Sequence, residues 1–302
     1  MKNSWFSYNN DNKYILEGVA SILENGYYIC KSSVEVEKID SWIKKYEEYK
    51  RTTLNKYIDQ LVEGEDVVRG KFRRMVNFHL IHKELQEFFA LNKALAITDQ
   101  LFGEPTTLYT SLYFEVGSAQ AFHRDTPYFW TNPGYQYFGV WCALEDVDES
   151  NGALKVIPGS HKIYDDHHFR NEIGLKDVDE NGKPKANSPI LWDEYQNKVY
   201  EKCKSRGLEE ISVSVKKGDT IIWHPQLMHG GGKLMDENRS RNSFVMHVTP
   251  KNFNVHAQDK YFDTASTCLS LNPGIVYTQT SAEREYRNDG IWAIAQKIFM
   301  NA

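Results

Sequence analysis

The sequence has no long apolar run, no excess of positive charge and no closely spaced cysteines. Nowhere do about 18 apolar residues follow one another, so we expect no membrane-spanning helix. The N-terminus leads into no apolar stretch of signal-peptide type. A formal net charge of −5 argues against nucleic acid or an anionic membrane as a partner. No C-x-x-C pair occurs, and we expect reduced thiols in a soluble, cytoplasmic protein from the four cysteines, Cys30, Cys142, Cys203 and Cys268.

The chain has enough apolar residues to bury a substantial core. It is 302 residues long, with 41% hydrophobic and 13% aromatic residues, which predicts one large domain over 1–302. It contains no internal repeat and no low-complexity tract. Changes in residue pattern divide the domain into a helical N-terminal part (1–105), a β core (106–250) and a C-terminal extension (251–302).

The N-terminal part carries helical periodicity. Residues 14–25 space their apolar side chains at three and four positions, and Gly26 follows where a C-terminal cap is expected. Residues 27–30 predict a short buried strand. Longer helical patterns cover about 34–61 and 81–103.

From residue 106 the pattern becomes strand-like. Residues 106–116 are dense in β-branched and aromatic side chains. Further strands, separated by Gly, Pro and Asn turns, favour a sandwich or jelly roll over alternating β-α units; we expect them at about 137–147, 154–158, 211–216, 219–223 and 243–249. The polar stretch 162–207 predicts an irregular, lid-like insertion between core strands.

One short stretch carries the ligands of a candidate metal site. His123 and Asp125 are two positions apart, so on an extended segment their side chains point to the same face. Histidine recurs at His229, after an apolar strand and before three glycines that let the backbone pass close to a ligand. Two histidines and one carboxylate form the facial triad that leaves iron(II) with open positions for oxygen chemistry.

The strand that follows His229 brings an arginine toward the same cavity. Arg241, Ser243, Val245 and His247 share one strand face. An antiparallel turn after His229 would therefore allow the guanidinium of Arg241 to enter the cavity that holds the metal.

In this order the motifs resemble the phytanoyl-CoA dioxygenase family of iron(II)/2-oxoglutarate-dependent oxygenases, over roughly 26–250. The most specific of them is Asn-Gly-Ala-Leu followed by Pro-Gly-Ser-His, which lies between the two halves of the triad. The motifs that carry the resemblance are at 26–30, 101–105, 123–125, 140–146, 151–162 and 229–232.

The resemblance implies a fold, cofactors and residue roles. The implied fold is an all-β core, a double-stranded β-helix (jelly roll, cupin-like), with flanking N-terminal and C-terminal helices. His123, Asp125 and His229 would be the catalytic iron(II) ligands. Arg241 would bind the distal carboxylate of the cosubstrate 2-oxoglutarate, and Trp141 would lie beside it. Such an enzyme uses O2, releases succinate and CO2, and oxidises a C–H bond; the carboxylate at Asp125 favours hydroxylation over halogenation.

Two arginines compete for the cosubstrate. The stretch from His229 to the arginine is about one residue longer than is usual in the family, and strand parity does not separate Arg239 from Arg241. The six-residue distance from Arg241 to His247 favours Arg241. A planar fork of donors suits the role, because it binds a carboxylate through two parallel hydrogen bonds.

Other functions remain open on the sequence alone. A zinc hydrolase could use the same three ligands, and a non-catalytic jelly-roll protein could bind a metal or ligand. The substrate of an oxygenase is expected to be a small polar metabolite or natural-product intermediate, handled free rather than on a carrier.

The basic residues at 69–74 predict a solvated face or a local anion site. Five aromatic residues lie near the predicted metal-binding strand: Tyr113, Tyr128, Phe129, Trp130 and Tyr137. Most of them are expected in the core, and two are expected to line a substrate pocket. His161 is expected to tie down a turn, and His224 to pack or cap.

Overall fold

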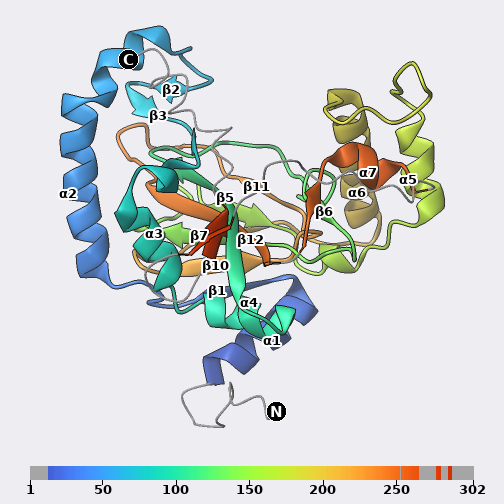
Figure 1. Cartoon of the computed structure of the whole chain (residues 1–302), viewed down its shortest axis with the longest axis horizontal. Coiled ribbons are helices and arrows are strands. Elements are labelled where there is room, and N and C mark those ends of the chain that lie inside the picture. Colours follow the sequence, from blue (N-terminus) through green and yellow to red (C-terminus); the bar gives the residue numbers. More distant parts are fainter. Residues whose placement is uncertain (1–12, 252, 265–276, 280–284, 288–302) are drawn as a thin grey trace.

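Two β-sheets pack face to face and form the centre of the molecule (Figure 1). The computed structural model describes residues 13–251, 253–264, 277–279 and 285–287. The larger sheet has the strand order β1 (Tyr27–Cys30), β10 (Thr220–Trp223), β7 (Phe138–Ala143), β12 (Ser243–Pro250), β5 (Thr106–Phe114), β15 (Glu285–Arg287), β14 (Tyr277–Gln279), and β4 (Met75–Val76) also pairs with β5. The smaller sheet has the order β11 (His229–Gly231), β8 (Leu154–Val156), β9 (Ile211–Val213). This is the double-stranded β-helix expected from the sequence.

The central strands of the larger sheet are buried on both faces. Successive side chains of a strand point to opposite faces. On β7, Trp141 therefore enters the cluster between the two sheets, while Val140 and Cys142 enter the cluster under the N-terminal helices. This double burial explains why β7 and β10 appear in the sequence as nearly continuous apolar runs rather than alternating ones.

Helices of the N-terminal part cover the outer face of the larger sheet. They are α1 (Lys13–Asn25), α2 (Val36–Thr52), α3 (Lys83–Ala90) and α4 (Leu95–Phe102), with the 3-10 turns η2 (Leu54–Gln60) and η3 (Phe78–Leu80). Trp42 and Tyr46 of α2 lie with centroids 5.7 and 4.9 Å from the ring of Tyr113 on β5. That packing closes the outer core with aromatic side chains.

Both long helices predicted in this part are interrupted. The one expected over 34–61 is α2 followed by η2, and the one over 81–103 is split into α3 and α4. Before α4, the Asn92 side chain accepts the amide of Ala94 at 2.9 Å. Such a local bond competes with helix continuation. The short hairpin strands β2 (Val67–Val68) and β3 (Lys71–Phe72), and β4 after them, were not predicted, since each is two residues long.

The insertion at 162–207 is helical, so the expectation of irregular structure was wrong. It contains α5 (His167–Gly174) and α6 (Pro189–Ser205), which gather with α7 (Gln258–Phe262) at one end of the molecule (Figure 1). Asp166 and Ser188 cap the two helices through the amides of Phe169 and Leu191. The buried side of α6 repeats every four residues, at Leu191, Tyr195, Val199 and Cys203. The helical signal was therefore present inside a polar sequence.

β6 (Trp130–Thr131) pairs with β13 (Val255–His256), and η4 (Ser160–Lys162) follows β8. Cys30, Cys142 and Cys203 are buried and unpaired, whereas Cys268 and most of the C-terminal extension lie outside the described residues. Within the described ranges, no helix is both long and apolar enough to span a membrane.

Candidate metal centre

His123, Asp125 and His229 converge on one point inside a cavity of the protein. A ligand atom from each lies within 4.8 Å of the others. The Nε2 atoms of His123 and His229 are 3.6 and 3.8 Å from Oδ1 of Asp125. All three side chains are buried. The structure thus brings together the three residues that the sequence singled out.

Backbone pairing places the two histidines opposite each other. His123 and His229 form an isolated antiparallel bridge, with N–H···O distances of 2.8 and 3.0 Å in the two directions. The bridge joins the segment before Asp125 to the start of β11. Ligands that are about a hundred positions apart in the chain are therefore held by direct hydrogen bonds between their own peptide groups.

Hydrogen bonds orient each ligand toward the same point. Nδ1 of His123 lies 2.8 Å from the carbonyl of Ala121, and Nδ1 of His229 lies 3.0 Å from the carbonyl of Leu227. Each Nδ1–H donates to its carbonyl, which leaves Nε2 with a free lone pair. Two imidazole nitrogens and one carboxylate oxygen then face one position, a donor set that fits iron(II).

The ionisation states suit a metal. Burial, followed by the neighbouring His229, lowers the pKa of His123 to about 4, so its imidazole is neutral at physiological pH. Burial by itself raises the pKa of Asp125. The two histidines beside it have a larger effect in the opposite direction, so the pKa lies below its ordinary value. Metal ligands must be deprotonated in this way.

Trp223 fixes the third ligand. Its indole Nε1 donates to Oδ2 of Asp125 at 2.8 Å, which leaves Oδ1 directed at the histidines. The indole lies over Gly139 of β7, where an added Cβ would come within 2.0 Å of it. Glycine is required at 139 because no side chain fits between the strand and this ring.

Trp223→Phe should lower iron(II) affinity about tenfold, since partners that orient metal ligands are typically worth about 10–100-fold. The phenyl ring fills most of the space but cannot donate to Asp125. Anaerobic titration calorimetry with iron(II) measures the change. Trp42→Phe, which removes an indole from the outer core, serves as the control. Equal losses in the two variants would mean that Trp223 acts through packing alone.

Arg241 lines the same cavity, and its positive charge has no carboxylate partner among the hydrogen bonds of the described residues. The cavity has a volume of about 600 Å³ and is lined by the triad, Arg241 and Trp141, among others. The guanidinium is 3% exposed, donates from Nη1 to the Gly152 carbonyl at 2.7 Å, and has no partner at Nε within the described structure. Its centre is 5.9 Å from the Trp141 ring. Burial lowers the pKa of Arg241 to about 10, so the group remains a cation.

Arg239 lies elsewhere. Its Nη1 is 2.8 and 2.7 Å from the two carboxylate oxygens of Asp148, on the partly exposed side of the loop before β12. It is not among the residues that line the cavity. The structure therefore separates the two arginines that strand parity could not.

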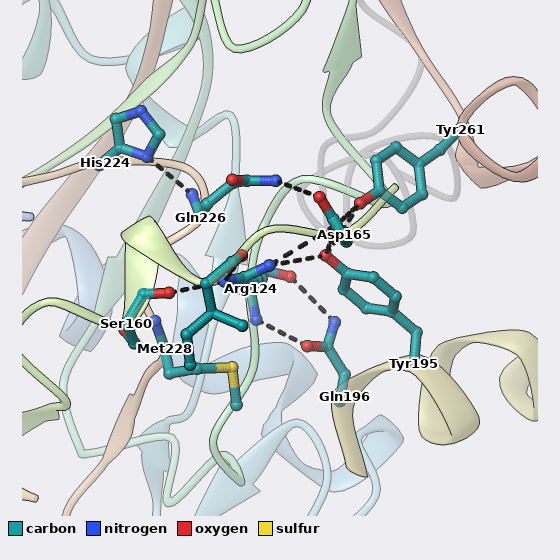
Figure 2. Close-up of polar contacts among 10 residues, drawn as sticks. Arg124, Ser160, Asp165, Tyr195, Gln196, His224, Gln226, Met228 and Tyr261 are labelled. Carbon is teal, nitrogen blue, oxygen red and sulfur yellow. Dashed lines mark hydrogen bonds and ion pairs between the residues drawn. The ribbon is translucent and has the colours of Figure 1, made fainter. Parts of the chain in front are cut away.

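A buried cluster ties the insertion to the metal-bearing segment (Figure 2). Arg124, between His123 and Asp125, donates to the carbonyls of Ser160 and Ile163 at 2.6 and 2.9 Å and to Tyr195 Oη at 3.2 Å. Gln196 of α6 bonds both backbone groups of Arg124, at 2.8 and 3.0 Å. Asp165 lies 3.6 Å from the guanidinium. Helix α6 is thereby locked to the segment that carries two of the three ligands.

Several cavity residues were missed as site residues from the sequence. Trp192 of α6 lies 4.5 Å from the Tyr128 ring and 5.7 Å from His123, between centroids. Arg74, Asn77 and His247 also line the cavity. Two of them had a signal: His247 shares a strand face with Arg241, and Arg74 belongs to the basic stretch 69–74 for which an anion site was one expectation. Tyr128 and Phe129 line the cavity, whereas Tyr113 and Tyr137 are fully buried.

The other histidines that the sequence raised lie outside the cavity. His161 Nε2 is 3.1 Å from the Leu23 carbonyl, which ties its turn to α1. His224 Nδ1 accepts the amide of Gln226 at 3.1 Å (Figure 2). These contacts agree with the turn and capping roles expected of them.

Comparison with known proteins identifies the family. The model of the family "Phytanoyl-CoA dioxygenase (PhyH)" matches residues 22–243. The peroxisomal phytanoyl-CoA dioxygenase of Mus musculus is 25% identical over 246 residues, which are 76% of this chain and 67% of the mouse protein. The Homo sapiens enzyme is 30% identical over 122 residues, 38% of this chain but only 29% of the human protein.

Solved structures share the fold. EctD from S. alaskensis, solved with 2-oxoglutarate and 5-hydroxyectoine, has a TM-score of 0.59 at 14% identity and covers 92% of this chain and 90% of its own. The epimerase SnoN, solved with Fe3+, alpha ketoglutarate and nogalamycin RO, has a TM-score of 0.58 at 13% identity, covering 90% and 98%.

The fold and the family match define the class of protein, an iron(II)- and 2-oxoglutarate-dependent dioxygenase that uses O2. Within that class the chain belongs to the phytanoyl-CoA dioxygenase family. The enzyme class and cofactors expected from the sequence are thereby confirmed.

Proposed function

We propose that this enzyme hydroxylates, or otherwise oxidises, a C–H bond of a small polar metabolite or natural-product intermediate that is handled free, with succinate and CO2 as co-products. The observation that carries the proposal is the presence, in one cavity, of three converging metal-ligand atoms and a buried, under-paired guanidinium. We further propose that it acts in the cytoplasm, with a small molecule as its substrate.

Each residue then has a role. His123, Asp125 and His229 hold iron(II), Trp223 keeps Asp125 aligned, and Arg241 binds the distal carboxylate of 2-oxoglutarate through its fork of donors. Trp141 packs beside the cosubstrate. When bound, iron(II) with 2-oxoglutarate and O2 supplies the oxidising power for the C–H bond. The aromatic walls of the cavity exclude water from the reacting atoms.

Two other functions fit the ligands less well. A zinc hydrolase needs three ligands and a water, but it has no use for a buried cation in the cavity. A non-catalytic binding protein gains nothing from a ligand set with open metal positions. Arg241 therefore favours the oxygenase over both.

The test is iron-dependent conversion of 2-oxoglutarate to succinate, followed by mass spectrometry. A screen of free metabolites for oxygen consumption identifies the substrate by its mass shift. Zinc in place of iron(II) should give no conversion. Hydrolysis supported by zinc, or iron and 2-oxoglutarate that bind without any turnover across the screen, would overturn the proposal in favour of one of the other two functions.

We propose that the insertion at 162–207 closes over the substrate. Asn187 and Trp192 line the cavity, while Gln196 holds α6 to Arg124. Movement is therefore expected in the polar connection between α5 and α6, at about 175–187, rather than in α6 itself. Limited proteolysis there should slow when iron(II), 2-oxoglutarate and a hit from the metabolite screen are all present. Unchanged cleavage would make the segment a plain surface excursion.

A further inference from the structure

Three neighbouring strands form a polar corner at the end of the cavity that lies away from Arg241. Arg241 lies two residues before β12 and His247 lies within it, six residues further on, which is roughly 20 Å of extended chain at about 3.3 Å per residue. Thr110 of β5 pairs with His247, and Val76 of β4 pairs with Leu112 of β5. Arg74, Asn77, Thr110 and His247 all line the cavity. We call these four residues the polar corner.

We propose that the polar corner binds the carboxylate of the substrate, so that the enzyme acts on a small organic acid with one carboxylate and a planar, largely apolar body. The inference rests on the proposed function and names the substrate class for the same cavity. Arg74 is the residue assigned to the charge, and Asn77 and His247 flank it.

Hydrogen bonding leaves the corner with donors rather than acceptors. Oδ1 of Asn77 accepts from the Thr110 hydroxyl at 2.6 Å and from the amide of Ser111 at 3.0 Å. Both lone pairs of this oxygen are then used, and the amide NH₂ is what remains for a ligand. Arg74 has only donors, and its side chain makes no hydrogen bond or ion pair with the described residues. A ligand group with several acceptors, such as a carboxylate, matches this arrangement.

His247 adds a neutral polar group to the same corner. It is 6% exposed, its Nδ1 is buried without a partner in the described structure, and its ring lies 4.9 Å from that of Phe129, between centroids. Burial is the main cause that lowers the pKa of His247 to about 4; Asp125 opposes the shift, whereas His229 and Arg74 add to it. The imidazole is therefore uncharged and contributes a hydrogen bond rather than a second positive charge.

The charge balance selects a single negative charge. Among the residues that line the cavity, the charged groups are Arg74, Arg241 and Asp125. Arg241 and Asp125 balance each other, and iron(II) balances the dianion 2-oxoglutarate, so Arg74, an exposed residue, is the one lining cation with no opposite charge among the lining residues. A carboxylate supplies one negative charge, whereas a phosphate monoester carries about −1.5 to −2 at neutral pH. The balance therefore favours a carboxylate over a phosphate.

The rest of the wall fits a flat body. Tyr128 and Trp192 lie 4.5 Å apart between centroids, and Phe129 and Tyr109 lie 6.1 Å apart edge to face. Trp192 lies 5.7 Å from the metal ligand His123, and Phe129 lies 4.9 Å from His247 of the polar corner, between centroids. Planar or ring-shaped ligands gain the most from such a surface.

The experiment uses the enzyme loaded with iron(II) and 2-oxoglutarate under strictly anaerobic conditions, so that binding is measured without turnover. Three matched probes are titrated by calorimetry: 3-phenylpropionate, 3-phenylpropionamide and 3-phenylpropyl phosphate. The acid should bind at least about tenfold more tightly than the amide, as expected for one charge-assisted hydrogen bond. Arg74→Gln should remove that preference and leave amide binding unchanged, while Arg74→Lys should retain part of it.

The control is Arg69→Gln, in the turn of the β2–β3 hairpin that precedes Arg74. Arg69 forms an ion pair with Glu237 at 2.6 Å and does not line the cavity, so its loss should change none of the three affinities. The inference is overturned by equal binding of acid and amide, by tighter binding of the phosphate, by an acid preference that survives Arg74→Gln, or by no binding of any probe up to its solubility limit. Iron(II) and 2-oxoglutarate are titrated first on every variant. Failure of those titrations in the unmodified enzyme is a failure of the proposed function instead.

Discussion

Replacing any one of His123, Asp125 or His229 by alanine should abolish iron-dependent conversion of 2-oxoglutarate to succinate. Each change removes one of three ligand atoms that lie within 4.8 Å of one another, and the backbone bridge between the two histidines cannot compensate for a missing donor. The fold should persist, because the side chains border an open cavity and their removal leaves no new void in the hydrophobic core. Iron titration, succinate formation and thermal unfolding measure the three consequences.

His168→Ala is the matched control for this series. His168 is exposed on α5, outside the cavity, so its removal should change neither iron affinity nor turnover. Full activity in any one of the three ligand variants would remove that residue from the metal site. Asp125→Ala should also release the indole of Trp223, which donates to this carboxylate. A small additional loss of thermal stability is therefore expected for that variant alone.

Arg241→Ala should weaken 2-oxoglutarate binding by roughly 30-fold or more. Breaking a buried, charge-assisted contact typically costs about 2–5 kcal/mol, much of it from leaving the partner charge unpaired, and about 1.4 kcal/mol corresponds to a factor of ten. The structural basis is a guanidinium that is 3% exposed and has a single carbonyl contact. Anaerobic titration with 2-oxoglutarate measures the loss. Iron(II) affinity should survive, because Arg241 supplies no metal ligand.

The comparison with Arg239→Ala makes this prediction specific. Arg239 is engaged with Asp148 away from the cavity, so its loss should change 2-oxoglutarate affinity by only a few-fold. Arg241→Lys should recover part of the affinity, since an ammonium is a point charge and cannot reproduce the fork. A larger loss in Arg239→Ala than in Arg241→Ala would transfer the cosubstrate role to Arg239.

Local rules predicted the parts of this protein that depend on neighbouring residues. Strand alternation placed His123 and Asp125 on one face, and the same alternation grouped Arg241 with His247. Gly26 ends α1 in the left-handed conformation, with φ of 86°, as its position after a periodic segment predicted. Where local hydrogen bonds compete with a long periodicity, as at Asn92, the sequence overestimated the length of the helix.

The insertion shows why polarity is a poor guide to order. Its exposed faces carry enough charge to resemble a loop, yet the buried side of α6 packs against α5, α7 and the end of the β core. The apolar partners of that side, including Tyr261, come from distant parts of the chain. The four-residue spacing within α6 was a local helical signal, but no window of the insertion contains the partners that bury that side.

The sequence by itself determined the family, the class of fold and the identity of the candidate ligands, because these depend on motifs and on the two-residue period of a strand. The tertiary structure alone decided which arginine faces the cavity. Arg239 and Arg241 would point to the same side of a strand, but Arg239 pairs with Asp148, whereas Arg241 lines the cavity. It also decided that Trp192, Arg74 and Asn77 belong to the site. Trp192 comes from a helix in the insertion, and Arg74 and Asn77 directly flank the two-residue strand β4 beside β5. Only the packing of these elements around the metal position gives them a common role.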